Sequence, residues 1–503
     1  MKVITRFPPS PTGNLHIGGA RTALFNYLYA KHHGGKIYLR LENTDEERSK
    51  EEYEQNIFDS LKWLGLAFDP VKSATADHGA GSIDGKPFWR QSERKDVYRT
   101  HLKKLVDSGR AYISKETPTT LQQPSSSTPL PPQYHSEAGY GAQRRLGVSP
   151  RAGEKGGEGK RRDEVVRFKN PNKKIAFDDL IRGHIEFDTT ELGDMVIAKS
   201  LEEPLYHLAV VIDDYEMGIT HVIRGEDHIS NTPRQLLLQE ALEFTRPLYA
   251  HIPLILAPDR SKLSKRHGAV SVTEYRDKGF LSEAFNNYLA LLGWNPGPAY
   301  RDEHGAGRTE QEIFSLDELI KSFDLSKVQK GGAIFTEEKL RWMNREYLKR
   351  GGIQSFIPHI PKELLAGRGE REVNAVAEMF FERVSVFGDI QTELASGEVE
   401  YLLKEPEYPK ELLKWKKATS EPAPHIREII SLLETIPDGQ FTKAAIKDAV
   451  MAYAEANGKG NVLWPMRVAL SGKEQSPDPF TLSAMLGKET VLRRLKQALT
   501  VLQ

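Results

Sequence analysis

The chain contains no cysteine, and this absence removes several kinds of chemistry at once. Without thiols there are no disulfides, no zinc–thiolate sites and no cysteine nucleophile, so covalent or metal chemistry must use other groups. Long apolar runs are also lacking, and none approaches the ~20 residues that a membrane helix needs. The first residues, MKVITRF, show neither the apolar core of a secretory signal nor an Arg- and Ser-rich presequence. We therefore expect a cytoplasmic protein without membrane association.

An excess of charge of either sign is absent too, because 70 Lys and Arg balance 70 Asp and Glu. A net charge of zero argues against a protein wrapped wholly in nucleic acid, although basic patches can exist within a balanced total. Hydrophobic residues make up 39% and charged residues 28%, as in soluble globular proteins. Since single cores stop growing near ~250–300 residues, a chain of 503 residues is expected to fold as several domains.

The first part of the chain alternates between strand and helix patterns, which predicts a doubly wound parallel sheet. Lys2 to Phe7 is expected to form a strand, followed by a helix with apolar residues along one face over 20–28. IYLRLEN, residues 37–43, alternates apolar and polar side chains and predicts a strand buried on one face only. Two further amphipathic helices are expected over 53–64 and 98–105.

Order is then lost from Thr117 to Asp163, a stretch rich in Pro, Ser and Gly that we expect to be disordered. Its basic end, Lys160 to Arg162, fits either a solvated linker or a contact with a phosphate backbone. Strand patterns resume with VVRFKN and GDMVIAKS, so an insertion interrupts one α/β domain. After about Phe323, segments such as KLRWMNREYLKR and VLRRLKQALTVL predict an all-helical C-terminal region.

The loop PSPTGNLHIGG lies between the first strand and the first helix. A glycine-containing loop at this place binds nucleotides in doubly wound sheets, because N–H groups at the helix start face the phosphates. The loop sequence matches neither GxGxxG nor GxxxxGK[ST], which disfavours a dinucleotide-binding fold and a P-loop. His16 can donate to phosphate oxygens, while Gly18 and Gly19 let a flat base approach the backbone. Taken alone, a loop histidine is more often structural or merely exposed.

A second loop, Ser261 to Gly268, reads SKLSKRHG and carries two lysines three residues apart. Lys262 and Lys265 can place ammonium groups on a polyphosphate while the loop moves. Taken alone, such a loop is a solvated surface turn in most proteins.

Together and in this order on such a sheet, the two loops are specific for one family of enzymes. PSPTGNLHIGG resembles the His-Ile-Gly-His signature, and KLSKR the Lys-Met-Ser-Lys-Ser signature, of class I aminoacyl-tRNA synthetases. The stretches TRFPPSPTG, LRLENTD, VVIDD, ITHVIRGEDHISNTP, FLSEAFNNYLALLGW and EKLRWMN resemble glutamyl-tRNA synthetases of bacterial type, over nearly all the chain. The resemblance implies a Rossmann-like doubly wound catalytic domain with an inserted connective domain, followed by an all-α anticodon-binding region. It also implies that L-glutamate is activated with ATP and Mg²⁺ to glutamyl adenylate and then esterified to the 3′ end of tRNA(Glu), with release of AMP and pyrophosphate, by a monomer.

The domain boundaries that the resemblance implies divide the chain into five segments. They are 1–115, the first half of the catalytic domain; 116–192, the inserted acceptor-binding segment with disordered 117–163; 193–245, the second half of the catalytic domain; 246–325, the Lys-Met-Ser-Lys-Ser-type loop and stem-contact domain; and 326–503, the helical anticodon-binding region.

The resemblance also assigns the site residues. His16, Lys262 and Lys265 are expected to be catalytic, because they would stabilise the negative charge that builds up on the phosphates. The expected ATP-binding residues are Thr12, His16, Gly18, Gly19, Asp227, His228, Ser264 and Lys265. The expected glutamate-binding residues are Arg6, Ser10, Glu42, Tyr206 and Arg224.

Glutamate carries two carboxylates and one ammonium group, so we expect its binding site to contain two arginines and one acidic residue. The resemblance supplies Arg6 for the side-chain carboxylate, Arg224 for the α-carboxylate and Glu42 for the α-ammonium. The reverse assignment of the two arginines stays open. The alternative for each arginine is an ion pair at a strand end, such as Arg40 with Glu42. Two buried arginines should reject the neutral glutamine, because a charge would be left unpaired.

Three features depart from the family pattern. Gly19 replaces the second histidine of the first signature, so a clamp of two histidines on the phosphates is not expected. Val210 stands where some members have an asparagine near the substrate. The zinc site that some members form with cysteines of the inserted segment cannot form here, and we expect no zinc and no protein-held metal.

The helical region is expected to bind tRNA. By family analogy Arg383 is a candidate reader of the last anticodon base. Other basic residues of this region are weaker candidates, since helix-surface cations are more often solvated. They are Lys339, Arg341, Arg345 and Lys349.

Other functions stay open at this point. A close relative would also charge tRNA(Gln) with glutamate, or would be a glutaminyl enzyme. Small-molecule nucleotidyltransferases share the two loops, but they are much shorter. A non-catalytic RNA-binding relative would be expected to lose His16, Lys265 or the paired arginines, and all of these are present.

Overall fold

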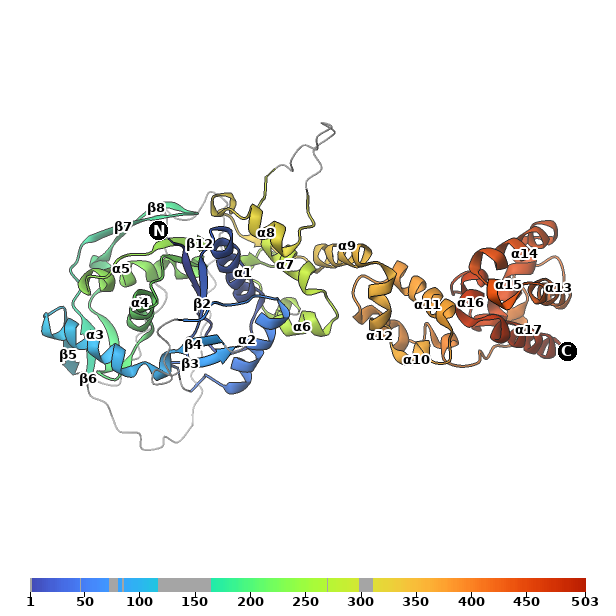
Figure 1. Ribbon diagram of the computed structural model, residues 1–503, viewed down its shortest axis with the longest axis horizontal. Coiled ribbons are helices and arrows are strands. Elements are labelled where there is room, and N and C mark those ends of the chain that lie inside the picture. The colour runs from blue at the N-terminus through green and yellow to red at the C-terminus, as the bar shows by residue number, and fades with distance from the viewer. Residues whose placement is uncertain are drawn as a thin grey trace. The chain divides into compact units, whose positions relative to one another are not determined.

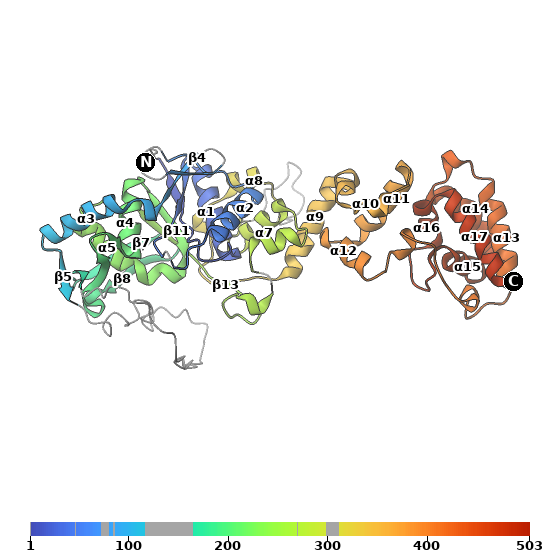
Figure 2. The same ribbon diagram turned by 90° about the horizontal axis from the view of Figure 1, so that it is seen from below.

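The computed structural model of the chain, drawn in Figure 1 and Figure 2, describes residues 2–45, 47–71, 80–83, 86–115, 164–268, 270–297 and 311–503. It divides into two compact units. The first comprises residues 1–274 and 286–336, and the second comprises residues 275–285 and 337–503. The expected disordered stretch 117–163, with its basic cluster, lies outside the described residues. The five predicted segments stay a prediction.

The first unit is built on parallel strands, as the alternating pattern predicts. One sheet has the order β1-β2-β4-β3, in which β1, β2 and β4 are parallel and β3 is antiparallel. Its strands are β1 (Ile4–Phe7), β2 (Lys36–Leu41), β3 (Ala80–Ile83) and β4 (Lys86–Arg90). The connecting and following helices are α1 (Ile17–His32), α2 (Glu51–Trp63), η2 (Gln91–Glu93) and α3 (Lys95–Asp107). The positions of α1, α2 and α3 agree with the three predicted helices, whereas η2 was not predicted.

A second sheet has the order β11-β12-β7-β8, with β11, β12 and β7 parallel. Its strands are β7 (Lys174–Asp179), β8 (Gly183–Asp188), β11 (His221–Gly225) and β12 (Leu248–Ile252). The helices around it are α4 (Tyr206–Glu216), η5 (Glu226–Asn231) and α5 (Thr232–Ala241), and Figure 1 shows α4 and α5 in green beside these strands. The second strand set therefore completes the doubly wound arrangement.

The strands β1 and β11 lie side by side at the centre of the first unit. Thr220 donates from its backbone to Ile4 at 3.0 Å, and Ile4 donates back to the Thr220 hydroxyl at 2.8 Å. The chain thus proceeds from β1 outwards to β2 and β4 on one side, and later returns to β11 on the other side. Ligands bind beyond the carboxyl ends of parallel strands at such a reversal point.

A third, antiparallel sheet has the order β10-β9-β6-β5. Its strands are β5 (Ala111–Lys115), β6 (Glu164–Phe168), β9 (Met195–Ser200) and β10 (Glu203–Pro204). The remaining elements before residue 337 are η4 (Thr189–Leu192), β13 (Ile255–Leu256), η6 (Lys265–His267), α6 (Val272–Asp277), α7 (Ser282–Leu291), α8 (Leu316–Ser322), η7 (Leu325–Lys327) and β14 (Ala333–Ile334). The end of α6 and the start of α7 belong to the second unit. The predicted strands VVRFKN and GDMVIAKS correspond to β6 and β9.

The burial of β2 differs from the prediction. Its alternation predicted one buried face, but Tyr38 is only 6% exposed and Arg40 is fully buried. The reason is that β2 lies between β1 and β4, in a parallel sheet whose two faces are both covered. Arg40 is accommodated there because acidic side chains pair with it, as described below.

The second unit is helical in its described part, as predicted. The predicted all-helical region after about Phe323 was wrong in one place, because the short strand β14 at 333–334 pairs with β13 in the first unit, and two residues are too few to show a strand pattern. Its helices are α9 (Glu337–Phe356), η8 (Ile357–His359), α10 (Lys362–Leu365), α11 (Glu370–Arg383), α12 (Gly388–Ala395), η9 (Glu400–Leu402), η10 (Lys410–Leu413), α13 (Pro422–Glu434), η11 (Asp438–Gln440), α14 (Lys443–Asn457), α15 (Lys459–Ser471), α16 (Pro479–Leu486) and α17 (Lys488–Leu502). Helix α9 is broken at Gly352, whose φ of 72° is incompatible with an α-helix. Within the described residues, no helix has the length and apolarity needed to cross a membrane.

Candidate active site

A cleft of about 1560 Å³ opens at the carboxyl ends of β1 and β11. It brings together all the predicted ATP- and glutamate-site residues except Lys265, whose side chain lies outside the described part of the chain. The predicted residues that line it are Arg6, Ser10, Thr12, His16, Gly18, Gly19, Glu42, Tyr206, Arg224, Asp227, His228, Lys262 and Ser264. Arg383 belongs to the second unit, at the end of α11.

His16 caps the N-terminus of α1. Its Nδ1 accepts a hydrogen bond from the backbone N–H of Gly19 at 3.1 Å. Because Nδ1 is the acceptor, the neutral ring carries its proton on Nε2, which leaves an N–H for a ligand at the helix start. Desolvation, and then the Lys262 ammonium, lower the pKa of His16, while Asp227 opposes them. The ring is therefore neutral near pH 7 and acts as a hydrogen-bond donor.

The two glycines after His16 have a local reason in this cap. A Cβ on Gly18 would lie 3.0 Å from the His16 ring, and a Cβ on Gly19 would lie 2.9 Å from the Leu15 side chain. A side chain at either position would therefore crowd the capping histidine or its neighbour. The same absence of side chains leaves the backbone open to a flat ligand.

Arg6 is buried at the end of β1 and is held from behind by Asp214 of α4. Its Nε lies 3.1 Å from Asp214 Oδ1, and its Nη1 has no hydrogen-bond partner among the described residues. An unpartnered buried donor of a charged group is costly unless a ligand completes it. Arg6 thus offers a fixed donor to the cleft that it lines.

Arg224 at the end of β11 is held by three core partners. Its Nε donates to His251 at 3.1 Å, its Nη1 to Gln235 at 2.8 Å and its Nη2 to Thr232 at 2.8 Å. These bonds use three of the five N–H groups of the guanidinium. One N–H on each Nη is left, which suffices for two hydrogen bonds to one carboxylate.

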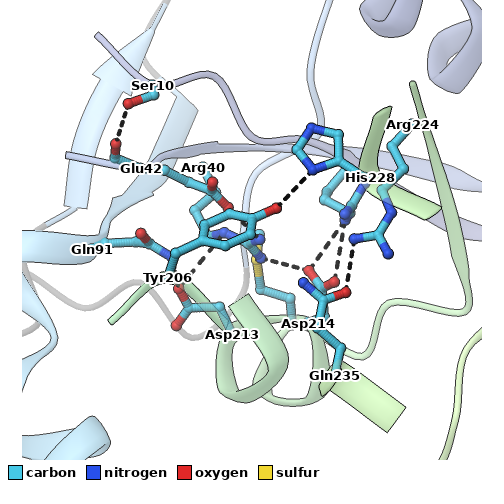
Figure 3. Close-up of polar contacts among 12 residues, drawn as sticks. Ser10, Arg40, Glu42, Gln91, Tyr206, Asp213, Asp214, Arg224, His228 and Gln235 are labelled. Carbon is cyan, nitrogen blue, oxygen red and sulfur yellow. Dashed lines mark hydrogen bonds and ion pairs between the residues drawn. The ribbon is translucent and has the colours of Figure 1, made fainter. Parts of the chain in front are cut away.

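Glu42 and Tyr206 complete this end of the cleft, as Figure 3 shows. Glu42 accepts from Arg40 Nη2 at 3.0 Å, so the ion pair considered as the alternative at this strand end is present. The Tyr206 hydroxyl lies 3.3 Å from Nδ1 of His228, and Ser10 donates to the backbone carbonyl of Glu42 at 2.9 Å. Burial, and then the Glu42 charge, raise the pKa of Tyr206 to about 12. The phenol therefore stays protonated.

The loop with the two lysines faces the same cleft. Lys262 Nζ lies 3.6 Å from Asp227 Oδ2, and the backbone N–H of Ser264 donates to Nδ1 of His267 at 3.1 Å. Lys265 begins the short helix η6. The Lys262 side chain is 67% exposed, so it is free to reorient toward a bound anion.

A buried charge network behind Arg6 was missed by the sequence analysis. Asp213 accepts from Arg94 at 2.8 Å, from Gln91 at 2.8 Å and from Tyr98 at 2.9 Å. Figure 3 shows its neighbour Asp214 together with Arg40, which donates to it at 2.7 Å. The one available signal was VVIDD, in which two acids end an apolar run on α4.

Replacement of Asp213 by Asn should destabilise the first unit. The substitution replaces a carboxylate by an amide, whose NH2 group cannot accept hydrogen bonds from the surrounding donors, and it leaves the Arg94 charge uncompensated. We therefore expect a loss of about 3–5 kcal/mol in the free energy of unfolding. Urea denaturation of the full chain, followed by circular dichroism, measures it. The control is Asp178→Asn, because this residue is 86% exposed in its pair with His184, and such pairs contribute about 0–1 kcal/mol. Equal losses in the two variants would contradict the role given to the network.

The stability of the first unit should fall on acidification. Desolvation is the largest cause that lowers the pKa of His207, His221, His228 and His251, each to about 4. In the unfolded chain these rings bind protons near pH 6.5, whereas the folded chain resists protonation until about pH 4. The unfolded state therefore binds more protons in this window, so the contribution to stability is present above pH 6.5 and is lost as pH falls toward 4.

Thermal denaturation at pH 7.5, 6.5 and 5.5 tests this pH dependence. The melting temperature should be lower at each step below pH 6.5. His221→Gln should make the fall shallower, because it removes one ring that the fold holds neutral. This ring lies outside the cleft lining, and the Thr220 hydroxyl lies 2.8 Å from its Nδ1. A melting temperature that is constant or rises on acidification would show that these rings are not held neutral by the fold.

Comparisons with known proteins cover both units. A family model described as tRNA synthetases class I (E and Q), catalytic domain, matches residues 2–342, and one described as anticodon binding domain matches residues 341–499. The glutamate–tRNA ligase of Heliobacterium modesticaldum is 40% identical over 98% of this chain and 96% of its own. That of Aquifex aeolicus is 40% identical over 99% of both chains. A crystal structure of a glutamate tRNA ligase from Elizabethkingia meningosepticum in complex with its amino acid covers 100% of both chains with a TM-score of 0.79 and 32% identity.

Proposed function

The chain belongs to the class I tRNA synthetases for glutamate and glutamine, as a glutamate–tRNA ligase, and we propose that it works through a glutamyl-adenylate intermediate. In this reaction the α-carboxylate of L-glutamate attacks the α-phosphate of ATP and pyrophosphate leaves. The terminal adenosine of tRNA(Glu) then attacks the carbonyl carbon of the adenylate, and AMP leaves. The observation that carries the proposal is a single cleft that holds the buried Arg6 and Arg224 together with the capping His16 of α1.

We assign the glutamate end of the cleft to the two arginines. Arg6, with its unpartnered Nη1, holds the side-chain carboxylate, and Arg224, with one N–H left on each Nη, holds the α-carboxylate. Glu42 faces the α-ammonium, and Ser10 and Tyr206 supply hydrogen bonds. A glutamine side chain would offer Arg6 one carbonyl oxygen in place of a carboxylate and would turn an NH2 donor toward a group that has only donors, which is the basis for discrimination.

The ATP end lies at the start of α1 and along the lysine loop. The Nε2–H of His16 donates to the phosphates, and Lys262 and Lys265 neutralise the charge that develops on them. Mg²⁺ arrives with ATP and is held mainly by the phosphates, since it rarely uses a full cage of protein ligands. The remaining ATP contacts in this assignment come from Thr12, Gly18, Gly19, Asp227, His228 and Ser264.

The second unit supplies the tRNA contacts in this proposal. Arg383 is the candidate reader of an anticodon base, because its side chain is 45% exposed and is only loosely paired with Glu393 at 3.7 Å. The anticodon-domain match over 341–499 contains it. The same match disfavours a small-molecule nucleotidyltransferase. An enzyme that also charges tRNA(Gln) draws no support from the comparisons.

Exchange of pyrophosphate into ATP tests the adenylate step. We expect exchange that requires glutamate and is fast only when tRNA(Glu) is present, as in the family that the sequence resembles. Glutamine in place of glutamate should give exchange near the background. Exchange that proceeds without any amino acid, or faster with glutamine, would contradict the proposal.

A further inference from the structure

Arg224 is the first member of a buried chain of three charged or polar residues. Its Nε lies 3.1 Å from Nε2 of His251, and the other ring nitrogen of His251, Nδ1, lies 2.6 Å from Asp179 Oδ2. The three side chains come from the parallel strands β11, β12 and β7. Arg224 is 5% exposed, Asp179 is 4% exposed and His251 is fully buried. Arg224 lines the cleft, whereas Asp179 and His251 do not.

The hydrogen bonds fix the protonation state of His251. A guanidinium has only donors, so Nε2 of His251 must accept from Arg224. The ring proton therefore sits on Nδ1 and is donated to Asp179. Asp179 is itself held by the backbone N–H groups of Ile181 at 3.0 Å and Arg182 at 2.8 Å. Each member of the chain thus has one orientation that satisfies its neighbours.

The charges agree with this arrangement. Desolvation lowers the pKa of His251 to about 4, although the Asp179 carboxylate acts in the opposite direction. Burial acts to raise the pKa of Asp179, but the hydrogen bonds from His251 and the two backbone groups lower it overall. Asp179 is therefore the anion that balances the buried Arg224 across a neutral ring. The other groups that face His251 are Arg182, Tyr249 and His228.

We propose that Asp179 and His251 are positioning residues for glutamate, which set the direction in which Arg224 presents its two remaining N–H groups to the cleft. This inference rests on the proposed function, because it takes the α-carboxylate of glutamate as the ligand of Arg224. With Nε fixed by His251, the guanidinium cannot rotate about its long axis without breaking the bonds to Gln235 and Thr232 as well. A carboxylate then meets a preorganised pair of donors.

The test is a comparison of KM values in tRNA(Glu) glutamylation by the full chain. His251→Phe keeps a planar ring but removes both hydrogen bonds, and we expect the KM for glutamate to rise by about 10-fold to 100-fold, as for a lost hydrogen bond to a charged group. The KM for ATP should change by less than about threefold in the same variant. His251→Gln retains an acceptor and a donor on one amide and should restore most of the affinity for glutamate.

Gln239→Met is the matched control. Gln239 is 3% exposed, bonds to the Tyr249 hydroxyl of the same strand β12 at 3.0 Å and does not line the cleft. It should lower stability without raising the KM for glutamate. If His251→Phe does not fold, Asp179→Asn with the same readout decides, and we expect a rise of about 10-fold in the KM for glutamate.

Two further results would overturn the inference. One is an equal rise of the KM values for glutamate and ATP, and the other is a His251 ring that ¹⁵N NMR of the full chain shows to be protonated at both nitrogens at pH 7. Failure of the proposed function would look different, because the unaltered protein would then not attach glutamate to tRNA(Glu) at all.

Discussion

Arg6→Lys is expected to raise the KM for glutamate by about 100-fold or more, because hydrogen bonds between a guanidinium and a carboxylate contribute about 1.5–3 kcal/mol each. Lysine keeps a positive charge for the buried Asp214 but has no second nitrogen to reach the cleft. In the native chain the two tasks are separate, since Nε lies 3.1 Å from Asp214 while Nη1 has no partner among the described residues. Steady-state glutamylation of tRNA(Glu) at varied glutamate and at varied ATP measures the effect.

Arg94→Lys is the matched control for Arg6→Lys. Arg94 belongs to the same buried network, through Asp213 at 2.8 Å, but it does not line the cleft. Its replacement should cost stability and leave both KM values within about threefold. A parallel rise of the KM for glutamate and the KM for ATP in Arg6→Lys would show that Arg6 only supports the fold.

Lys265→Ala is expected to lower the rate of aminoacylation by about 100-fold or more, which is the scale of a lost charge contact to a transition state. The lysine follows Ser264, which lines the cleft, and begins η6 in the loop whose other lysine lies 3.6 Å from Asp227. The effect should be on kcat, with little change in the KM for glutamate, because the contact strengthens as charge develops on the phosphates. Single-turnover formation of glutamyl-tRNA measures it directly.

Arg266→Ala provides the comparison for Lys265→Ala. The Arg266 guanidinium is occupied within the loop, by His267 at 3.0 Å and Ser261 at 3.1 Å, and it does not line the cleft. Its loss should leave the rate within about threefold of normal. If Lys265→Ala turned over at a near-normal rate, the catalytic role of this lysine would be wrong.

The sequence predicted the elements that carry the cleft because local periodicity identifies them. The strand over Lys2 to Phe7, the helix after His16 and the helical second unit all appear in the structure. The prediction that β2 is buried on one face only was wrong, since alternation along one strand does not show what covers its other face. Arg40 is fully buried there because Asp214 at 2.7 Å and Glu42 at 3.0 Å compensate its charge.

The residues that line the candidate site could be predicted from the sequence, but the buried residues that hold them in place could not. The predicted lining depends on two signatures and on family resemblance, and the structure places those residues around one cleft. The supporting pairs are far apart in sequence, as with Arg6 and Asp214 at a separation of 208 residues, or Asp179 and His251 at 72. No local pattern couples such positions. Only the packing of α4 against β1 and the pairing of β7 with β12 bring them into contact.

The most direct test of the proposed function is the charging of isolated tRNA(Glu) and tRNA(Gln) with labelled glutamate and labelled glutamine. We expect ATP-dependent attachment of glutamate to tRNA(Glu), with AMP and pyrophosphate as products, and no attachment of glutamine to either tRNA. Glutamate on tRNA(Gln) as well would establish the broader enzyme that the comparisons do not support. Glutamine on either tRNA, or no glutamate on tRNA(Glu) at saturating ATP, would show that the proposed function is wrong.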